Sequence, residues 1–168
     1  YNKVLQYIQE EKEKIPMLAE IATKELEFKD ERKYKECLAE LNENANDDGA
    51  EFYADIKRGF SSDFYSYHKY ICVVQADGDN MGKIVSAVGA DNVVKVSEAL
   101  LKYGKEVWNK VKDYGGLPIY AGGDDLLFLA PVKGKDSKSI FGLIDDIDLL
   151  YKKEVDDAIG SFRPNGLN

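Results

Sequence analysis

The sequence predicts an α+β domain preceded by a helical segment, and three observations support this prediction. A β-branched apolar run, Tyr70–Ala76, indicates a buried strand. Two more apolar runs, 117–121 and 126–130, are joined by a Gly-Gly pair and two acids, as in a β-hairpin. Apolar residues at helical spacing lie between and after these strands. The resulting β-α-β-β-α order is that of a ferredoxin-like fold whose final strand is absent.

Two amphipathic helices are expected on one face of this sheet, near residues 92–113 and 138–159. A right-handed crossover makes the first hairpin strand parallel to the strand at Tyr70–Ala76, and hairpin strands are antiparallel to each other. We therefore expect the second hairpin strand to pair with Tyr70–Ala76. The absent final strand would leave Tyr70–Ala76 as an exposed edge.

The pattern divides the chain into a helical segment (1–50), an aromatic-rich connector (51–69) and a C-terminally truncated α+β domain (70–168). Pro16 is expected to separate a first helix from a second, longer one, because proline fits a helix only in its first turn. The aromatic residues of the connector are expected to pack on a neighbouring domain rather than to stack on bases. His68 has no obvious partner in the sequence, which predicts a surface residue.

Composition restricts the possible functions. The formal net charge of −8 argues against a chain that binds nucleic acid over its whole surface. Cys37 and Cys72 lack a CxxC spacing and predict reduced thiols in the cytoplasm. No apolar run approaches the length of a membrane span, so no membrane partner is expected.

Two acidic clusters follow the predicted strands. Asp77 and Asp79 come directly after the first strand, and Asp124 and Asp125 occupy the hairpin turn. Taken alone, the hairpin acids fit a solvated turn equally well. If the second hairpin strand pairs with Tyr70–Ala76, however, all four acids meet at one end of the sheet. This arrangement predicts a site for two Mg²⁺ or Mn²⁺ ions about 4 Å apart, suited to in-line phosphoryl displacement.

The loop after Asp77 suits a nucleotide triphosphate, because its glycines let backbone N–H groups approach phosphates and Lys83 adds positive charge. An EF-hand would need Asp or Asn at Met81 and Glu at Val88, and a Walker A loop would need Ser or Thr at Ile84. Both motifs are therefore excluded. The candidate nucleotide-binding residues are Gly78, Asp79, Asn80, Met81, Gly82, Lys83, Gly122 and Gly123.

The two motifs, Ala76–Lys83 and Tyr120–Asp125, together resemble the palm domain of the large subunit of type III CRISPR effector complexes, closest to the type III-B form. The resemblance implies a palm that joins ATP into cyclic oligoadenylates when the complex binds target RNA. It assigns metal binding to Asp77, Asp124 and the Gly78 carbonyl, and an assisting role to Asp125. It also implies guide RNA, target RNA and other subunits as partners. Because the active form pairs two palms, we expect this fragment alone to be a poor enzyme.

The sequence leaves two alternative functions open. A diguanylate or nucleotide cyclase shares the architecture, although Asp125-Leu126 stands where the Glu-Phe of diguanylate cyclases would fall. A catalytically silent palm would instead act as a scaffold for guide RNA and neighbouring subunits. Intact acids at both clusters favour an enzyme over a degenerate site.

Overall fold

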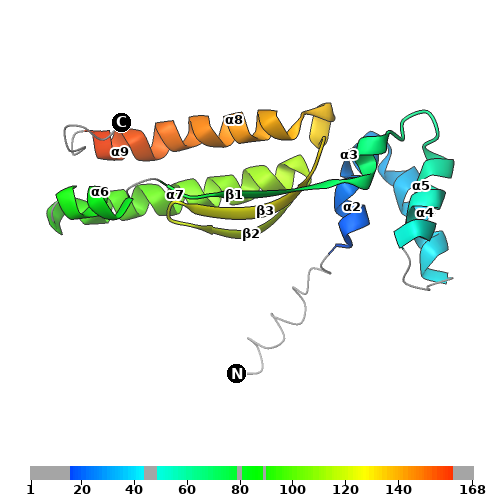
Figure 1. The fold of residues 1–168 in the computed structure, drawn as a ribbon, viewed down its shortest axis with the longest axis horizontal. Coiled ribbons are helices and arrows are strands. Elements are labelled where there is room, and N and C mark those ends of the chain that lie inside the picture. The colour runs from blue at the N-terminus through cyan, green and yellow to red at the C-terminus, as the bar shows by residue number, and fades with distance from the viewer. Residues whose placement is uncertain (1–15, 44–48, 79–80, 89, 161–168) are drawn as a thin grey trace, which may run out of the picture.

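The computed structural model describes residues 16–43, 49–78, 81–88 and 90–160 (Figure 1). The helical segment contains α2 (Leu18–Ala22), α3 (Lys24–Lys29), α4 (Glu31–Glu43), α5 (Gly49–Gly59) and the 3₁₀ turn η1 (Ser66–Lys69). The domain after it contains β1 (Ile71–Ala76), α6 (Met81–Val88), α7 (Ala90–Tyr114), β2 (Leu117–Gly122), β3 (Asp125–Pro131), the 3₁₀ turn η2 (Lys135–Ser137), α8 (Ile140–Tyr151), the π-helical turn η3 (Lys152–Asp156) and α9 (Asp157–Ile159).

The three described strands form one sheet in the order β1-β3-β2, and β3 is antiparallel to both neighbours. Val74 pairs with Phe128, and Ala76 pairs with Leu126. The prediction that the second hairpin strand pairs with the first strand of the domain is therefore confirmed. Within the described sheet, β1 is an edge strand, as expected.

The hairpin turn is tighter than predicted. The strands continue to Gly122 and from Asp125, which form the last pair of the ladder, so only Gly123 and Asp124 make the turn. Gly123 has a φ of 66°, a left-handed conformation that glycine adopts without steric cost. Asp124 therefore belongs to the turn and Asp125 to a regular strand.

Helices α7 and α8 lie together on one face of the sheet, as predicted (Figure 1). Alternate residues of β3 point into the core between sheet and helices, because side chains alternate along a strand. The buried residues of this core include Val96, Tyr103, Val107, Val111, Leu126, Phe128, Ala130, Leu143 and Ile147. A side chain at Gly104 would lie 3.1 Å from the Ala121 carbonyl oxygen, so glycine permits the close approach of α7 to β2. The helix predicted at 138–159 is confirmed as α8, η3 and α9.

The prediction of two helices around Pro16 is wrong for the part that the structure describes, and the first helix lies outside it. After Pro16 the chain forms three helices, with breaks at Thr23 and Asp30. The Thr23 hydroxyl bonds the Ala19 carbonyl (2.7 Å) and the Tyr34 hydroxyl (2.6 Å). Asp30 has a non-helical backbone (φ −152°, ψ 87°), and its side chain accepts a bond from the Lys33 amide (3.0 Å), which caps α4. Polar side chains with hydrogen bonds of their own thus stand where α2 and α3 end.

The helical segment has its own hydrophobic cluster, separate from the core of the sheet. Phe52, Ile56 and Phe60 of α5 pack against Leu26 and Tyr34. Aromatic residues of the predicted connector therefore complete the core of the helices that precede it. The division into 1–50, 51–69 and 70–168 stays a prediction about domains.

His68 is not the surface residue that the sequence predicted. It is fully buried, and its Nε2 lies 3.0 Å from Oε2 of Glu25. The partner is 43 residues away along the chain, on α3, so no local pattern could identify it. Glu25 is itself 2% exposed.

Candidate functional site

The end of β1 and the hairpin turn lie side by side. Since Ala76 pairs with Leu126, Asp77 and Gly78 leave β1 next to the turn that holds Asp124. A Cβ atom at Gly78 would lie 2.5 Å from the Asp124 Cβ and 2.8 Å from its Oδ2. Only a glycine allows the Asp124 side chain to rest against the backbone at residue 78. The two acidic motifs are therefore in direct contact.

A pocket of about 400 Å³ opens at this place. Asp77, Gly78 and Asp124 line it on the side of the sheet, and all of its lining residues belong to residues 76–151. None of the described residues of the helical segment lines it. The remaining lining residues are Ala76, Ile84, Tyr103, Leu126, Ile144, Ile147, Asp148 and Tyr151. The pocket thus combines carboxylates with an apolar and aromatic wall.

The aromatic part of that wall is a pair of tyrosines from two helices. The rings of Tyr103 on α7 and Tyr151 lie edge to face, with centroids 5.2 Å apart and an interplanar angle of 85°. Burial, with smaller effects of Tyr151 and Asp148, raises the pKa of Tyr103 to about 12. Tyr103 is therefore a neutral hydroxyl at physiological pH and can donate a hydrogen bond.

None of the other described candidate site residues lines the pocket. Asp125 is exposed at the start of β3 and is not among the residues that line the pocket. Its neighbour Leu126 lines the pocket, and successive side chains of a strand point to opposite faces. Met81 is buried at the start of α6, and its neighbours Gly82 and Lys83 are exposed. Asp79 and Asn80 lie outside the described residues. Gly122 and Gly123 are half-buried in the hairpin.

Sequence reasoning missed the contribution of α8. Ile144, Asp148 and Tyr151 are spaced by four and three residues, so they share one face of the helix. A carboxylate on an otherwise apolar helix face was the available signal. Asp148 also forms an ion pair with Lys152 (2.5 Å). The structure adds a third acid to the pocket with Asp77 and Asp124.

The pocket offers few side chains for the predicted metal ions. In the described part of the chain, no three or more His, Cys, Asp or Glu side chains are grouped to hold a metal ion. Mg²⁺ nevertheless needs only one or two protein carboxylates when substrate phosphates complete its shell. Asp124 beside the Gly78 backbone, with Asp77 in the same pocket, provides oxygen donors of that kind. The donors fit a metal that arrives with a nucleotide.

Comparison with protein-family models matches residues 70–163 to the family described as Cas10/Cmr2, second palm domain. The matched range is more than half of the chain. The chain belongs to this family. It includes a palm domain of a type III CRISPR large subunit, and the resemblance stated from the two motifs is confirmed. Neither the curated proteins nor the solved structures gave a match.

Membership in the Cas10/Cmr2 palm family has two direct consequences. The palm belongs to a nucleotidyltransferase and cyclase family, and to a subunit of a multisubunit CRISPR complex. Among the helices of the described ranges, none has both the length and the apolar character needed to cross a membrane.

Proposed function

We propose that this palm, within the complete large subunit, joins ATP into cyclic oligoadenylates when the complex binds target RNA. The observation that supports the proposal is that Asp77 and Asp124 line the same pocket, with Asp124 against Gly78 and an aromatic wall beside them. Carboxylates suit metal-bound phosphates, and an apolar wall suits a base. The reaction would take place in the cytoplasm, where the CRISPR complex meets its RNA.

The acidic side of the pocket would hold the reacting groups. Asp77, Asp124 and the Gly78 carbonyl would bind two Mg²⁺ or Mn²⁺ ions, with Asp125 assisting from the neighbouring strand position. When bound, these ions would stabilise the charge of the attacking and leaving oxygens. The 3′-hydroxyl of one ATP would attack the α-phosphate of another, and pyrophosphate would leave.

The loop after β1 would hold the phosphates and ribose through the segment from Asp79 to Lys83. Met81 is buried in the core of the palm, which fixes where α6 starts. The exposed positions of Gly82 and Lys83 leave the first turn of α6 accessible to an anion. A purine ring would lie on the wall formed by Ile144, Tyr103 and Tyr151.

The test uses the complete large subunit in its complex with guide RNA. With target RNA, Mn²⁺ and labelled ATP or GTP, we expect cyclic oligonucleotides from ATP. The double variant Asp77→Asn with Asp124→Asn keeps the size of both side chains and removes two charges. We expect at least a hundredfold loss of product, because two metal ligands are lost together.

The matched control is Asp113→Asn with Asp145→Asn, which removes two exposed charges from α7 and α8 outside the pocket. It should retain the parent activity. Full product from the Asp77 and Asp124 double variant would refute the assignment. Product from GTP alone would instead identify a diguanylate-type or related cyclase.

One observation favours a second candidate, a silent scaffolding palm. The absence of three grouped metal ligands among the described residues is compatible with a palm that binds guide RNA and neighbouring subunits without catalysis. The net charge of −8 argues against RNA contacts over the whole surface. An intact complex that assembles but makes no product from any nucleotide would support this candidate.

A further inference from the structure

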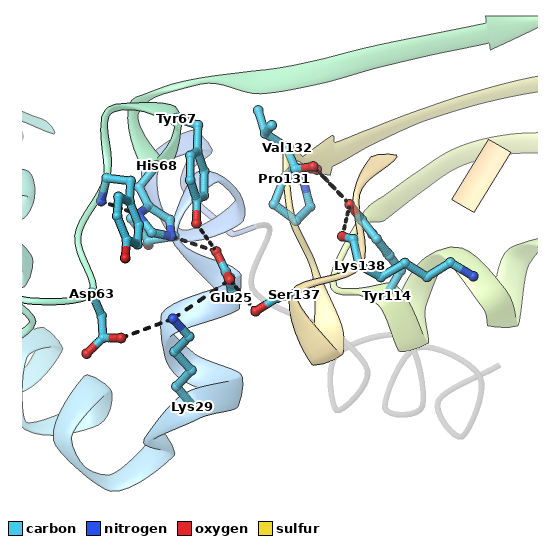
Figure 2. Close-up of polar contacts among 12 residues, drawn as sticks. Glu25, Lys29, Asp63, Tyr67, His68, Tyr114, Pro131, Val132, Ser137 and Lys138 are labelled. Carbon is cyan, nitrogen blue, oxygen red and sulfur yellow. Dashed lines mark hydrogen bonds and ion pairs between the residues drawn. The ribbon is translucent and has the colours of Figure 1, made fainter. Parts of the chain in front are cut away.

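Glu25 is a buried carboxylate at the place where three separate segments of the chain meet (Figure 2). It lies on α3 of the helical segment. Its partners come from η1, which leads into β1, and from η2, which lies between β3 and α8. These contacts lie where β1 begins and β3 ends, at the opposite end of the sheet from the acidic pocket (Figure 1).

Both oxygens of Glu25 accept hydrogen bonds. Oε1 accepts from the Ser137 hydroxyl (2.6 Å) and lies 3.8 Å from the Lys29 ammonium. Oε2 accepts from the Tyr67 hydroxyl (2.8 Å) and from His68 Nε2 (3.0 Å). Three hydrogen bonds thus use most of the roughly four acceptor positions of the carboxylate, and the Lys29 ammonium adds an ion pair at a longer distance. The side chain is therefore held from several directions at once.

The protonation state of His68 follows from its second nitrogen. The Tyr65 amide donates to Nδ1 (2.9 Å), so that atom carries a lone pair and the neutral ring donates from Nε2. Burial, only partly opposed by Glu25, lowers the pKa of His68. Burial alone would raise the pKa of Glu25, but the bonds from Ser137, Tyr67 and His68 and the charge of Lys29 lower it below its ordinary value. A carboxylate thus meets neutral donors and one ammonium.

The palm loop that reaches Glu25 has an unfavourable backbone. Asp136 and Ser137 have φ values of 56° and 55°, a left-handed conformation that non-glycine residues rarely adopt in succession. The base of the loop is held from the palm side, where the Tyr114 hydroxyl reaches the carbonyl of Lys138 (3.0 Å). The middle of the loop is held by the bond from Ser137 to Glu25. Backbone bonds within the loop also support it, from the Ser137 amide to Gly134 (3.1 Å) and from the Lys138 amide to Lys135 (3.1 Å), and the bond to Glu25 ties the loop to the helical segment.

Helix α8 begins directly after this loop. Ser139 caps it by accepting a bond from the Gly142 amide (3.3 Å). The same helix carries Ile144, Asp148 and Tyr151 to the pocket, between about 6 and 17 Å from its first residue, Ile140, at about 1.5 Å per residue. A change at the start of α8 can therefore reach the pocket wall through one rigid element.

We propose that Glu25 is a latch: it fastens the helical segment to the palm and holds the η2 loop in its left-handed conformation, which sets the position of α8. Release of the helical segment would let the loop relax and loosen the first turn of α8. The consequence for the pocket rests on the proposed function, whereas the latch itself does not.

Hydrogen exchange of the complete large subunit tests the latch. In Glu25→Gln the charge is lost and the amide presents a donor to groups that need an acceptor. We expect the amides of 133–142 to exchange at least about tenfold faster, which corresponds to about 1.4 kcal/mol. The matched control is Glu27→Gln on the same helix, whose carboxylate pairs with Lys24 (2.5 Å) and does not reach the palm. It should leave these amides unchanged.

A second variant keeps the test valid if Glu25→Gln fails to fold. Ser137→Ala removes one hydroxyl from an exposed loop and should accelerate exchange in 133–142 while α4 and α5 stay protected. Unchanged exchange in the first variant, or in Ser137→Ala if the first does not fold, would overturn the latch.

Nucleotide joining is measured on the same proteins. We expect Ser137→Ala to raise the KM for ATP several-fold with little change in kcat, because the wall carried by α8 would move while Asp77 and Asp124 stay in place. A parent complex that makes no product would refute the proposed function and leave the exchange result to decide the latch. A loosened loop with unchanged KM would remove the connection to the pocket.

Discussion

At the scale of single residues, the site depends on one glycine and one carboxylate. Gly78 has no side chain, so Asp124 can lie where a Cβ atom would otherwise stand. Asp77 then lines the same pocket from the adjacent position in the chain. Each acid alone is an ordinary carboxylate of a loop or turn. Their joint position in one pocket makes this place a candidate site.

Gly78→Ala should therefore destabilise the palm by about 1–3 kcal/mol, because its Cβ would overlap Asp124 and force the turn to move. Thermal or urea unfolding measures this change. Gly82→Ala is the matched comparison, since a Cβ there meets nothing within 4 Å in a helix. It should be neutral or stabilising by up to about 1 kcal/mol. Equal effects of the two changes would contradict the close contact.

His68 makes a second prediction at this scale, concerning pH. It is the single histidine of the sequence, and the folded protein holds its ring neutral with a lowered pKa. The unfolded chain takes up a proton near pH 6.5, whereas the folded chain does so only at lower pH. The stability due to the neutral ring is thus complete above pH 6.5 and is lost as the pH falls toward the folded pKa.

Urea unfolding at pH 7.5 and pH 5.5 should show this loss in the parent. His68→Gln has no group that titrates in this range, so it should be less stable overall and have a flatter pH dependence. A parent whose unfolding free energy rises on acidification would show that the sign of the pKa shift is wrong. Glu25 acts in the same direction at lower pH, because its lowered pKa makes stability fall as the carboxylate is protonated.

At the scale of elements, α8 has two roles that follow from its amphipathic pattern. Leu143 and Leu150 are buried in the core, while Ile144 and Tyr151 reach the pocket. Tyr151 packs edge to face on Tyr103, and such pairs contribute about 0.5–1.5 kcal/mol beyond their buried area. The helix thus joins the core of the palm to its candidate substrate site.

Tyr151→Ala should raise the KM for ATP roughly 5- to 160-fold in the complete complex, because stacking on a base contributes about 1–3 kcal/mol. The turnover number should change much less, since the acids are untouched. Phe141→Ala is the control on the same helix, because Phe141 is 74% exposed and does not line the pocket. Steady-state kinetics with both variants would contradict the wall assignment if their KM values agree.

At the scale of the whole molecule, two hydrophobic clusters lie on either side of the Glu25 contacts. Among the described residues, all that line the acidic pocket belong to the palm, and the helical segment contacts the far end of the sheet. Metal and nucleotide are therefore expected to stabilise the palm directly. The described helices of the helical segment can affect the pocket through the elements between them.

Mn²⁺ and ATP together should raise the melting temperature of the chain more than either alone, since the described carboxylates provide an incomplete metal shell. Saturation at about 100 times Kd stabilises by about 2.7 kcal/mol, or roughly 5–10 °C for a chain of this size. The Asp77→Asn and Asp124→Asn double variant should be at least as stable as the parent in EDTA and lose this increment. An unchanged increment would locate the metal site elsewhere.

The sequence by itself determined the order of strands and helices in the palm, the pairing of β1 with β3, and the meeting of Asp77 with Asp124. These features follow from local periodicity, turn chemistry and crossover handedness, all of which can be read from neighbouring residues. Only the tertiary structure decided that Asp148 joins the pocket, that Asp125 does not line it, and that His68 is buried. The bonds from Ser137 and His68 to Glu25 span 112 and 43 residues. Contacts of that range depend on how whole elements pack, and no local pattern encodes them.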